Sequence, residues 1–152
     1  MYQTLTFCHS VVRWFVLISL IYAIYRAYKG YTKDLAFSKF DNSIRHWTAT
    51  IAHIQLIIGI TLYTQSPVIK YFWNNIKEAL HNPDVVFFGL YHFLLMLMAI
   101  VIITIGSALT KRKANDKAKF KTMLVWYAIA LIIIFLAIPW PFSPFTSRPY
   151  FR

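Results

Sequence analysis

Acidic side chains are scarce in this chain. It has five Asp and Glu residues among 152, against 16 Lys and Arg, and charged residues make up 14% of the total. A soluble domain has about a quarter of its residues charged. All five acids lie in expected loops or at span ends, which argues against an ion pump built on buried carboxylates and excludes a carboxylate-rich di-metal centre. They are Asp34, Asp41, Glu78, Asp84 and Asp116.

Cysteine is nearly absent as well, since Cys8 is the single one in the sequence. A disulfide framework and a Cys–Cys metal site within the chain are therefore excluded. Cys8 precedes His9, but Leu5 occupies the position that a Cys-x-x-Cys-His haem attachment gives to its first cysteine, so covalent c-type haem is not expected. The first residues lack the positive region of a signal peptide, and the first apolar run is expected to remain as a span.

Apolar residues are abundant: 59% of the chain is hydrophobic and its mean hydropathy is +0.53. The apolar runs are about 20 residues long without alternation, which indicates membrane-spanning helices and not barrel strands. We expect a single-domain, all-α integral membrane four-helix bundle in the lipid bilayer. The expected spans are residues 5–28, 44–65, 84–110 and 120–138.

Local signals support these boundaries. Gly30 is a plausible stop for the first span, and the cap residues 41–43 precede the second. Asn82 and Pro83 resemble an N-cap followed by a first-turn proline, and Pro139 ends the fourth span.

A short amphipathic helix is expected over residues 67–80, between the second and third spans. Ser66 can cap it, and its apolar residues share one helical face. This pattern is typical of a helix that lies on the membrane surface or covers the end of the bundle. The residues of that face are Ile69, Phe72, Trp73, Ile76 and Leu80.

Basic residues indicate how the bundle is oriented. The region between the first two spans holds Arg26, Lys29, Lys33, Lys39 and Arg45, and that between the last two holds Lys111, Arg112, Lys113, Lys117, Lys119 and Lys121. The other side has only Lys70, Lys77, Arg148 and Arg152. Both termini are therefore expected outside the cytoplasm. Anionic lipid explains the net charge of +11, and no nucleic acid partner is expected.

Apart from residues at the span ends, four ionisable residues fall inside the expected spans, and such residues suggest a functional site. They are His9, Arg13, His53 and His92. With a helix rise of 1.5 Å per residue, His9 and His92 should share a level near the outer third of the bilayer, with His53 near the middle. Two imidazoles on different helices at one depth can bind a haem iron from both faces, so His9 and His92 are the expected metal ligands.

Several alternatives remain open at this point. His53 is the main rival for either ligand position, and Met96 could replace His92. Zinc fits less well because three or four ligands do not converge. Arg13 needs a haem propionate, helix-end carbonyls, a lipid headgroup or a partner's carboxylate. The histidines could also be interhelical hydrogen-bonding groups.

The chain resembles, over nearly its whole length, small bacterial inner-membrane proteins of the family called "cytochrome B". The resemblance rests on "HSVVRW" in the first span, "HIQLIIGITLY" in the second, His92 followed by "MLMAIVIITIG" in the third, and "IPWP" after the fourth. It implies a multi-pass protein of the bacterial inner (cytoplasmic) membrane with periplasmic termini. It also implies b-type haem at His9, Arg13, His53 and His92. The family often has an acid before the third-span histidine, where this chain has Tyr91.

The leading functional hypothesis is a b-type haem protein that exchanges electrons with quinol or a respiratory partner. The chain is expected to be an electron carrier or subunit and not a stand-alone enzyme. A second hypothesis is a non-haem accessory subunit of a larger inner-membrane complex, in which Arg13 meets an acid on another membrane subunit. A third is a quinone or lipid site without haem, built from His53, Gln55 and Arg13.

Overall fold

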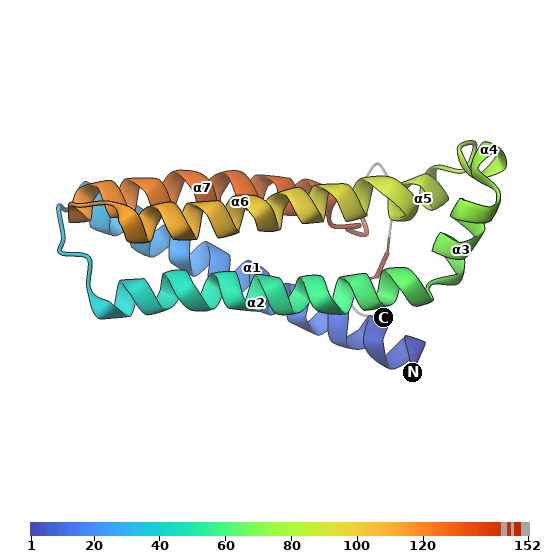
Figure 1. Cartoon of the computed structure of the whole chain (residues 1–152), viewed down its shortest axis with the longest axis horizontal. Coiled ribbons are helices and arrows are strands. Elements are labelled where there is room, and N and C mark those ends of the chain that lie inside the picture. Colours follow the sequence, from blue (N-terminus) through green and yellow to red (C-terminus); the bar gives the residue numbers. More distant parts are fainter. Residues whose placement is uncertain (144–145, 147, 150–152) are drawn as a thin grey trace.

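The computed structural model describes residues 1–143, 146 and 148–149, and this part of the chain is helical without any strand. Four segments are long and apolar enough to cross a membrane, which confirms the all-α four-helix prediction (Figure 1). These are α1 (Tyr2–Thr32), α2 (Lys39–Gln65), a third segment Pro83–Arg112 that ends in α6 (His92–Arg112), and α7 (Asp116–Ala137).

The four spans pack in a ring. α1 packs against α2 and α7, and α6 packs against the same two helices, so α1 and α6 face each other across the centre of the bundle. The core between them is filled by large apolar side chains that include Leu20, Ile103, Phe120, Met123 and Tyr127. Two glycines allow neighbouring side chains to pack directly on a helix backbone. A Cβ on Gly106 would collide with Trp126, and a Cβ on Gly30 would collide with Phe120.

α2 begins at Lys39, earlier than the cap residues 41–43 suggested. Ser38 is its N-cap, and the Ser38 side chain accepts from the Asp41 backbone while Asp41 Oδ2 accepts from the Ser38 backbone at 3.0 Å. This reciprocal pair satisfies two helix-end donors at once. Asp41 is only 1% exposed, and its carboxylate also accepts from Arg26 at 2.7 Å. The expected cap residue Asp41 thus serves at the third helical position.

The expected helix over residues 67–80 is divided in two. α3 (Pro67–Asn74) follows Ser66 with proline in its first turn, and the single-turn α4 (Ile76–Ala79) comes after a break at Asn75. Because Asn75 leaves the helical conformation, the predicted apolar face is split. Ile69 and Phe72 are buried, whereas Trp73, Ile76 and Leu80 are exposed.

The third span begins as its sequence predicts. Asn82 caps α5 (Pro83–Val86) by accepting from the Val85 backbone, and Pro83 occupies the first turn. The next five residues, Phe87–Tyr91, form a π-helical turn named η1, and α6 starts directly after it at His92. A π-helical turn is rare and often lies at a functional site.

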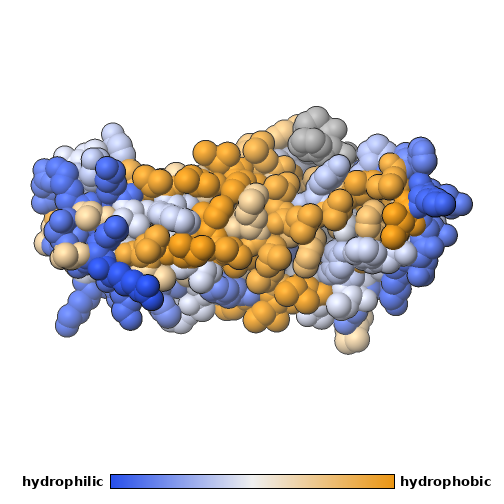
Figure 2. Space-filling model, turned by 45° about the horizontal axis from the view of Figure 1, so that its top comes forward, coloured by the Kyte–Doolittle hydropathy of each residue, from blue (hydrophilic) through white to orange (hydrophobic). Residues whose placement is uncertain are grey.

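The two ends of the bundle differ. The two connections over residues 33–38 and 113–115, together with the Lys- and Arg-rich helix ends beside them, lie at one end, called here the basic end. Residue 1 and helices α3–α5 lie at the other end, called here the N-terminal end (Figure 1). An apolar middle separates two hydrophilic ends (Figure 2), as expected of a multi-pass membrane protein. Arg152, used above to orient the chain, lies outside the described residues.

Candidate functional site

His9 and His92 lie against each other near the N-terminal end of the bundle. Their ring centroids are 6.4 Å apart and the ring planes are inclined by 67°. His9 comes from α1 and His92 from the start of α6, so the pair joins two helices that face each other across the bundle. The two side chains therefore lie at the same level of the bundle, as the sequence predicts.

One nitrogen of His92 has a defined role. Nδ1 lies 2.8 Å from the carbonyl oxygen of Ala137, the last residue of α7. A carbonyl only accepts, so Nδ1 carries the proton and donates, and Nε2 is left with a lone pair. Histidine ligands of metals are usually oriented by such a bond from the other ring nitrogen.

The sequence "IPWP" explains why the Ala137 carbonyl is available. In a continuing helix, the carbonyls of Phe135 and Ala137 would accept from residues 139 and 141, which are both proline and have no N–H group. The Trp140 indole donates to the Phe135 oxygen at 2.8 Å, and His92 donates to the Ala137 oxygen at the same distance. The two prolines thus leave two helix carbonyls without a backbone donor, and the side chains of Trp140 and His92 donate to them instead.

The π-helical turn before His92 is held by the neighbouring helices. Tyr63 of α2 donates to the Gly89 carbonyl at 2.8 Å, and Trp73 of α3 donates to the Tyr63 oxygen at 3.1 Å. Gly89 packs directly on Phe72 of α3, since an added Cβ would lie 2.6 Å from that ring. The helices α2 and α3 therefore help to set the start of α6 and, with it, His92. Composition and periodicity had not singled out Tyr63.

His9 of α1 lies beside α2. An added Cβ on Gly59 would lie 3.4 Å from His9 Cε1, an ordinary van der Waals distance, so Gly59 of α2 is a neighbour of the imidazole. Gln55 donates to the His9 backbone carbonyl at 3.0 Å. Two buried polar atoms here, His9 Nδ1 and Gln55 Oε1, have no hydrogen-bond partner among the described residues. A group that uses such atoms is the usual reason for their presence in a buried site.

Arg13 lies one turn along α1 from His9, partly buried. Its guanidinium carbon is 5.8 Å from the centroid of the Trp14 ring. Trp14 in turn meets Trp140 edge to face at a centroid distance of 5.9 Å. Because Trp140 follows the end of α7, Arg13 lies near the N-terminal end of the bundle. From this level a long cationic side chain can extend to the membrane surface.

His53 does not join the histidine pair. It is exposed on α2, and its Nε2 lies 3.0 Å from the Thr104 hydroxyl of α6. It precedes Gly59, the α2 residue beside His9, by six residues, or roughly 9 Å of helix. Of the four ionisable residues expected to form one site, the structure brings together His9 and His92, with Arg13 one turn away, and places His53 apart.

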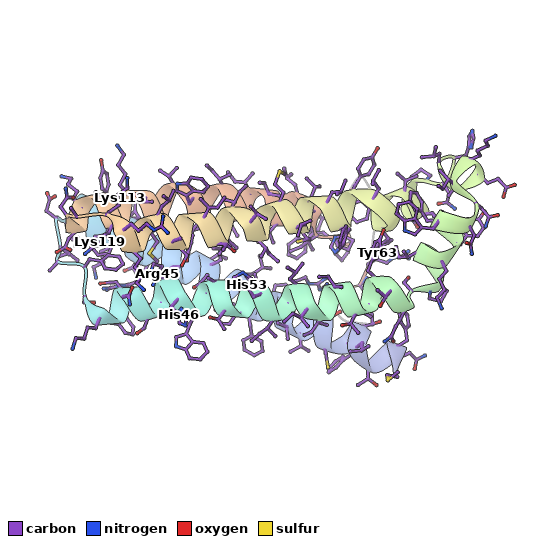
Figure 3. The ribbon with its side chains drawn as sticks, viewed as in Figure 1. Arg45, His46, His53, Tyr63, Lys113 and Lys119 are labelled. Carbon is purple, nitrogen blue, oxygen red and sulfur yellow. The ribbon has the colours of Figure 1, made fainter. Side chains whose placement is uncertain are left out.

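A second buried cation lies at the basic end and was expected in a loop. Arg45 is only 6% exposed, inside α2. Figure 3 shows Arg45 on α2 near the basic end. Its Nε and Nη2 donate to Asn42 Oδ1 at 3.1 and 3.0 Å, and its Nη1 donates to the carbonyl and the hydroxyl of Ser107. Tyr127 donates to the Arg45 carbonyl at 2.7 Å. Neutral oxygens therefore hold this charge and tie α2 to α6 and α7.

In the part of the chain that the structure describes, no group of three or more His, Cys, Asp or Glu side chains is placed to hold a metal ion. The pair His9–His92 thus offers two nitrogen ligands and no carboxylate, which does not suit a zinc ion that requires three or four protein ligands. No protein-family model, curated protein or solved structure matches this chain.

Proposed function

We propose that His9 and His92 are the axial ligands of one non-covalent b-type haem, and that the protein carries electrons within the membrane. The observation that supports this most directly is the pairing of two imidazoles from opposite helices, with His92 oriented by Ala137. A haem supplies its own four nitrogens and needs two axial ligands from the protein, so a site of two histidines without a third ligand suits it.

The spacing of the two rings supports the same proposal. Imidazole nitrogens bind transition metals at about 2 Å, so two rings on opposite sides of one ion have their centres roughly 6 Å apart. The distance between the His9 and His92 centroids is 6.4 Å. An inclination of 67° between the ring planes is compatible with axial binding, because each ring can rotate about its own metal bond.

The surroundings add two features to the proposal. Phe87 and Phe88 lie 5.8 and 6.1 Å from the His92 ring, and they supply apolar aromatic surface next to it. Arg13, one turn from His9, would bind a propionate, because a guanidinium can bind a carboxylate with two parallel hydrogen bonds. When bound, the haem would exchange single electrons, and the protein residues would orient it, exclude water and balance its charge. Quinol or a redox subunit of the membrane is the proposed partner.

The reduced-minus-oxidised visible spectrum of the protein, purified in a mild detergent, tests this proposal. A Soret and an α band of a low-spin haem at about one haem per chain are expected. A pure, helical protein with neither band, even after it is supplied with haem, would contradict the proposal. Stoichiometric co-purification with other membrane proteins, without haem, would favour the accessory-subunit hypothesis.

A further inference from the structure

His53 lies at the centre of α2, far from both ends of the span. It is the fifteenth residue of the 27 in α2, and it is exposed. Figure 3 shows it on the side of α2 that faces α6. An exposed imidazole in the middle of a membrane is costly, so such a residue usually marks a site. Its role is not taken up by the histidine pair.

The hydrogen bonds around His53 determine which of its nitrogens can accept. The Thr104 hydroxyl donates to the Ile100 carbonyl at 2.7 Å. Its single proton is thereby used, so at 3.0 Å from His53 Nε2 the Thr104 oxygen acts as the acceptor. Nε2 of His53 is therefore protonated and donates, and Nδ1 has a lone pair. Among the described residues nothing donates to that Nδ1.

Most of the exposed side chains near this acceptor are apolar. Ile54 and Ile57 of α2 and Val101 and Ile105 of α6 are all exposed near His53 and Thr104 in the sequence of their helices. α2 also has the smallest buried share of the four spans. A molecule that reaches this surface must come from the bilayer, present apolar surface and offer one hydrogen-bond donor.

We propose that this surface, made of His53, Thr104 and the four apolar residues named above, binds a quinol, whose hydroxyl donates to His53 Nδ1. A quinol meets each of the three requirements, because it dissolves in the bilayer, has an apolar body and carries O–H donors. Its oxidised form, the quinone, has only acceptors and cannot make this bond. The inference rests on the proposed electron-carrier function and deepens it by giving the proposed quinol partner a binding site and a preference for the reduced form, while the binding itself does not require haem.

The preference for quinol over quinone is the direct test. The dissociation constants of a short-chain benzoquinol and its quinone are measured anaerobically on the full chain in nanodiscs, with and without haem. Wild-type protein should bind the quinol about fivefold to tenfold more tightly, which is the scale of one hydrogen bond. Equal affinity for the two forms, or no binding of either, would overturn the proposal.

Two variants locate the effect. His53→Leu should remove the preference for quinol. Thr104→Val should reduce it while the histidine stays, because without the Thr104 oxygen the proton on His53 can move to Nδ1. His46→Leu, on the same helix near the basic end, is the control and should keep the preference. An unchanged preference in both site variants would overturn the proposal, as would a dimer in the nanodisc that buries His53 against a second copy.

The result can be separated from the haem proposal. His53→Leu and Thr104→Val should keep any low-spin haem spectrum, since neither residue contacts the pair of His9 and His92. Loss of the quinol preference with an intact spectrum assigns the effect to His53. A protein that takes up no haem even when supplied with it, and that still distinguishes quinol from quinone, would refute the haem proposal alone.

Discussion

The imidazole of His92 donates through Nδ1 to the carbonyl oxygen of Ala137 at 2.8 Å. This bond satisfies one of the carbonyls that every helix leaves without a partner at its C-terminal end. It also joins the first residue of α6 to the last residue of α7, which lie 45 positions apart in the chain. The same hydrogen bond therefore satisfies a carbonyl at the end of α7 and fixes the orientation of the His92 ring, including its Nε2.

Substitution of either proposed ligand should abolish the low-spin haem spectrum. We expect this for His9→Ala and for His92→Ala separately, because a single imidazole leaves one axial position of the iron without its protein ligand. The measurement is the reduced-minus-oxidised spectrum of each purified variant. His81→Ala is the control, since His81 is exposed and its Nδ1 bonds to the Lys77 carbonyl of its own turn. Retention of low-spin haem in both ligand variants would refute the assignment.

Removal of the Tyr63 hydroxyl should loosen the π-helical turn. Tyr63→Phe removes the donor to the Gly89 carbonyl, and an intramolecular hydrogen bond contributes about 1 kcal/mol to stability. We expect a lower melting temperature, followed by circular dichroism in detergent, and faster amide exchange over residues 87–91. Tyr22→Phe is the matched control because Tyr22 is exposed on α1. Equal stability of the two variants would show that this bond does not hold the turn.

A methyl group at two glycines should have opposite outcomes. At Gly106 an added Cβ would collide with Trp126 Cβ, close to a helix backbone that cannot move aside easily, so Gly106→Ala should destabilise the bundle by about 1–3 kcal/mol. At Gly59 the nearest atom, His9 Cε1, is 3.4 Å away, and Gly59→Ala should be tolerated. Thermal unfolding of both variants in one detergent checks this. A Gly106→Ala protein as stable as wild type would contradict the close packing of α6 on α7.

Arg45→Lys should destabilise the basic end although the charge is kept. A lysine ammonium cannot reproduce the planar set of donors that reaches Asn42 and Ser107 together. Hydrogen bonds to a charged group contribute about 1.5–3 kcal/mol, so the melting temperature should fall clearly. Arg112→Lys, at an exposed position of the same end, should have almost no effect. Equal melting of the two variants would mean that charge alone matters at position 45.

Much of the fold and part of the site could be predicted from single residues and their spacing. Asn82 and Pro83 marked the start of the third span because capping depends on local chemistry. The level shared by His9 and His92 followed from helix rise alone. Arg45 looked like a loop residue, and its burial depends on Ser107, which lies 62 residues away. Such distant contacts leave no local pattern.

The separation of His53 from the histidine pair has a similar cause. Its depth was expected to be greater than that of His9, but its partner Thr104 could not be identified from the spacing of either helix. The π-helical turn was missed for another reason. Residues 87–91 read as ordinary apolar helix, and the contacts that this turn makes with Tyr63 and Phe72 come from α2 and α3.

That π-helical turn sets the direction of His92 relative to the residues before it. An α-helix advances by about 100° per residue and the wider turn by less, so the same five residues wound as a regular α-helix would leave His92 rotated away from its present direction. The winding of Phe87–Tyr91, a segment without a histidine, therefore decides whether His92 faces His9.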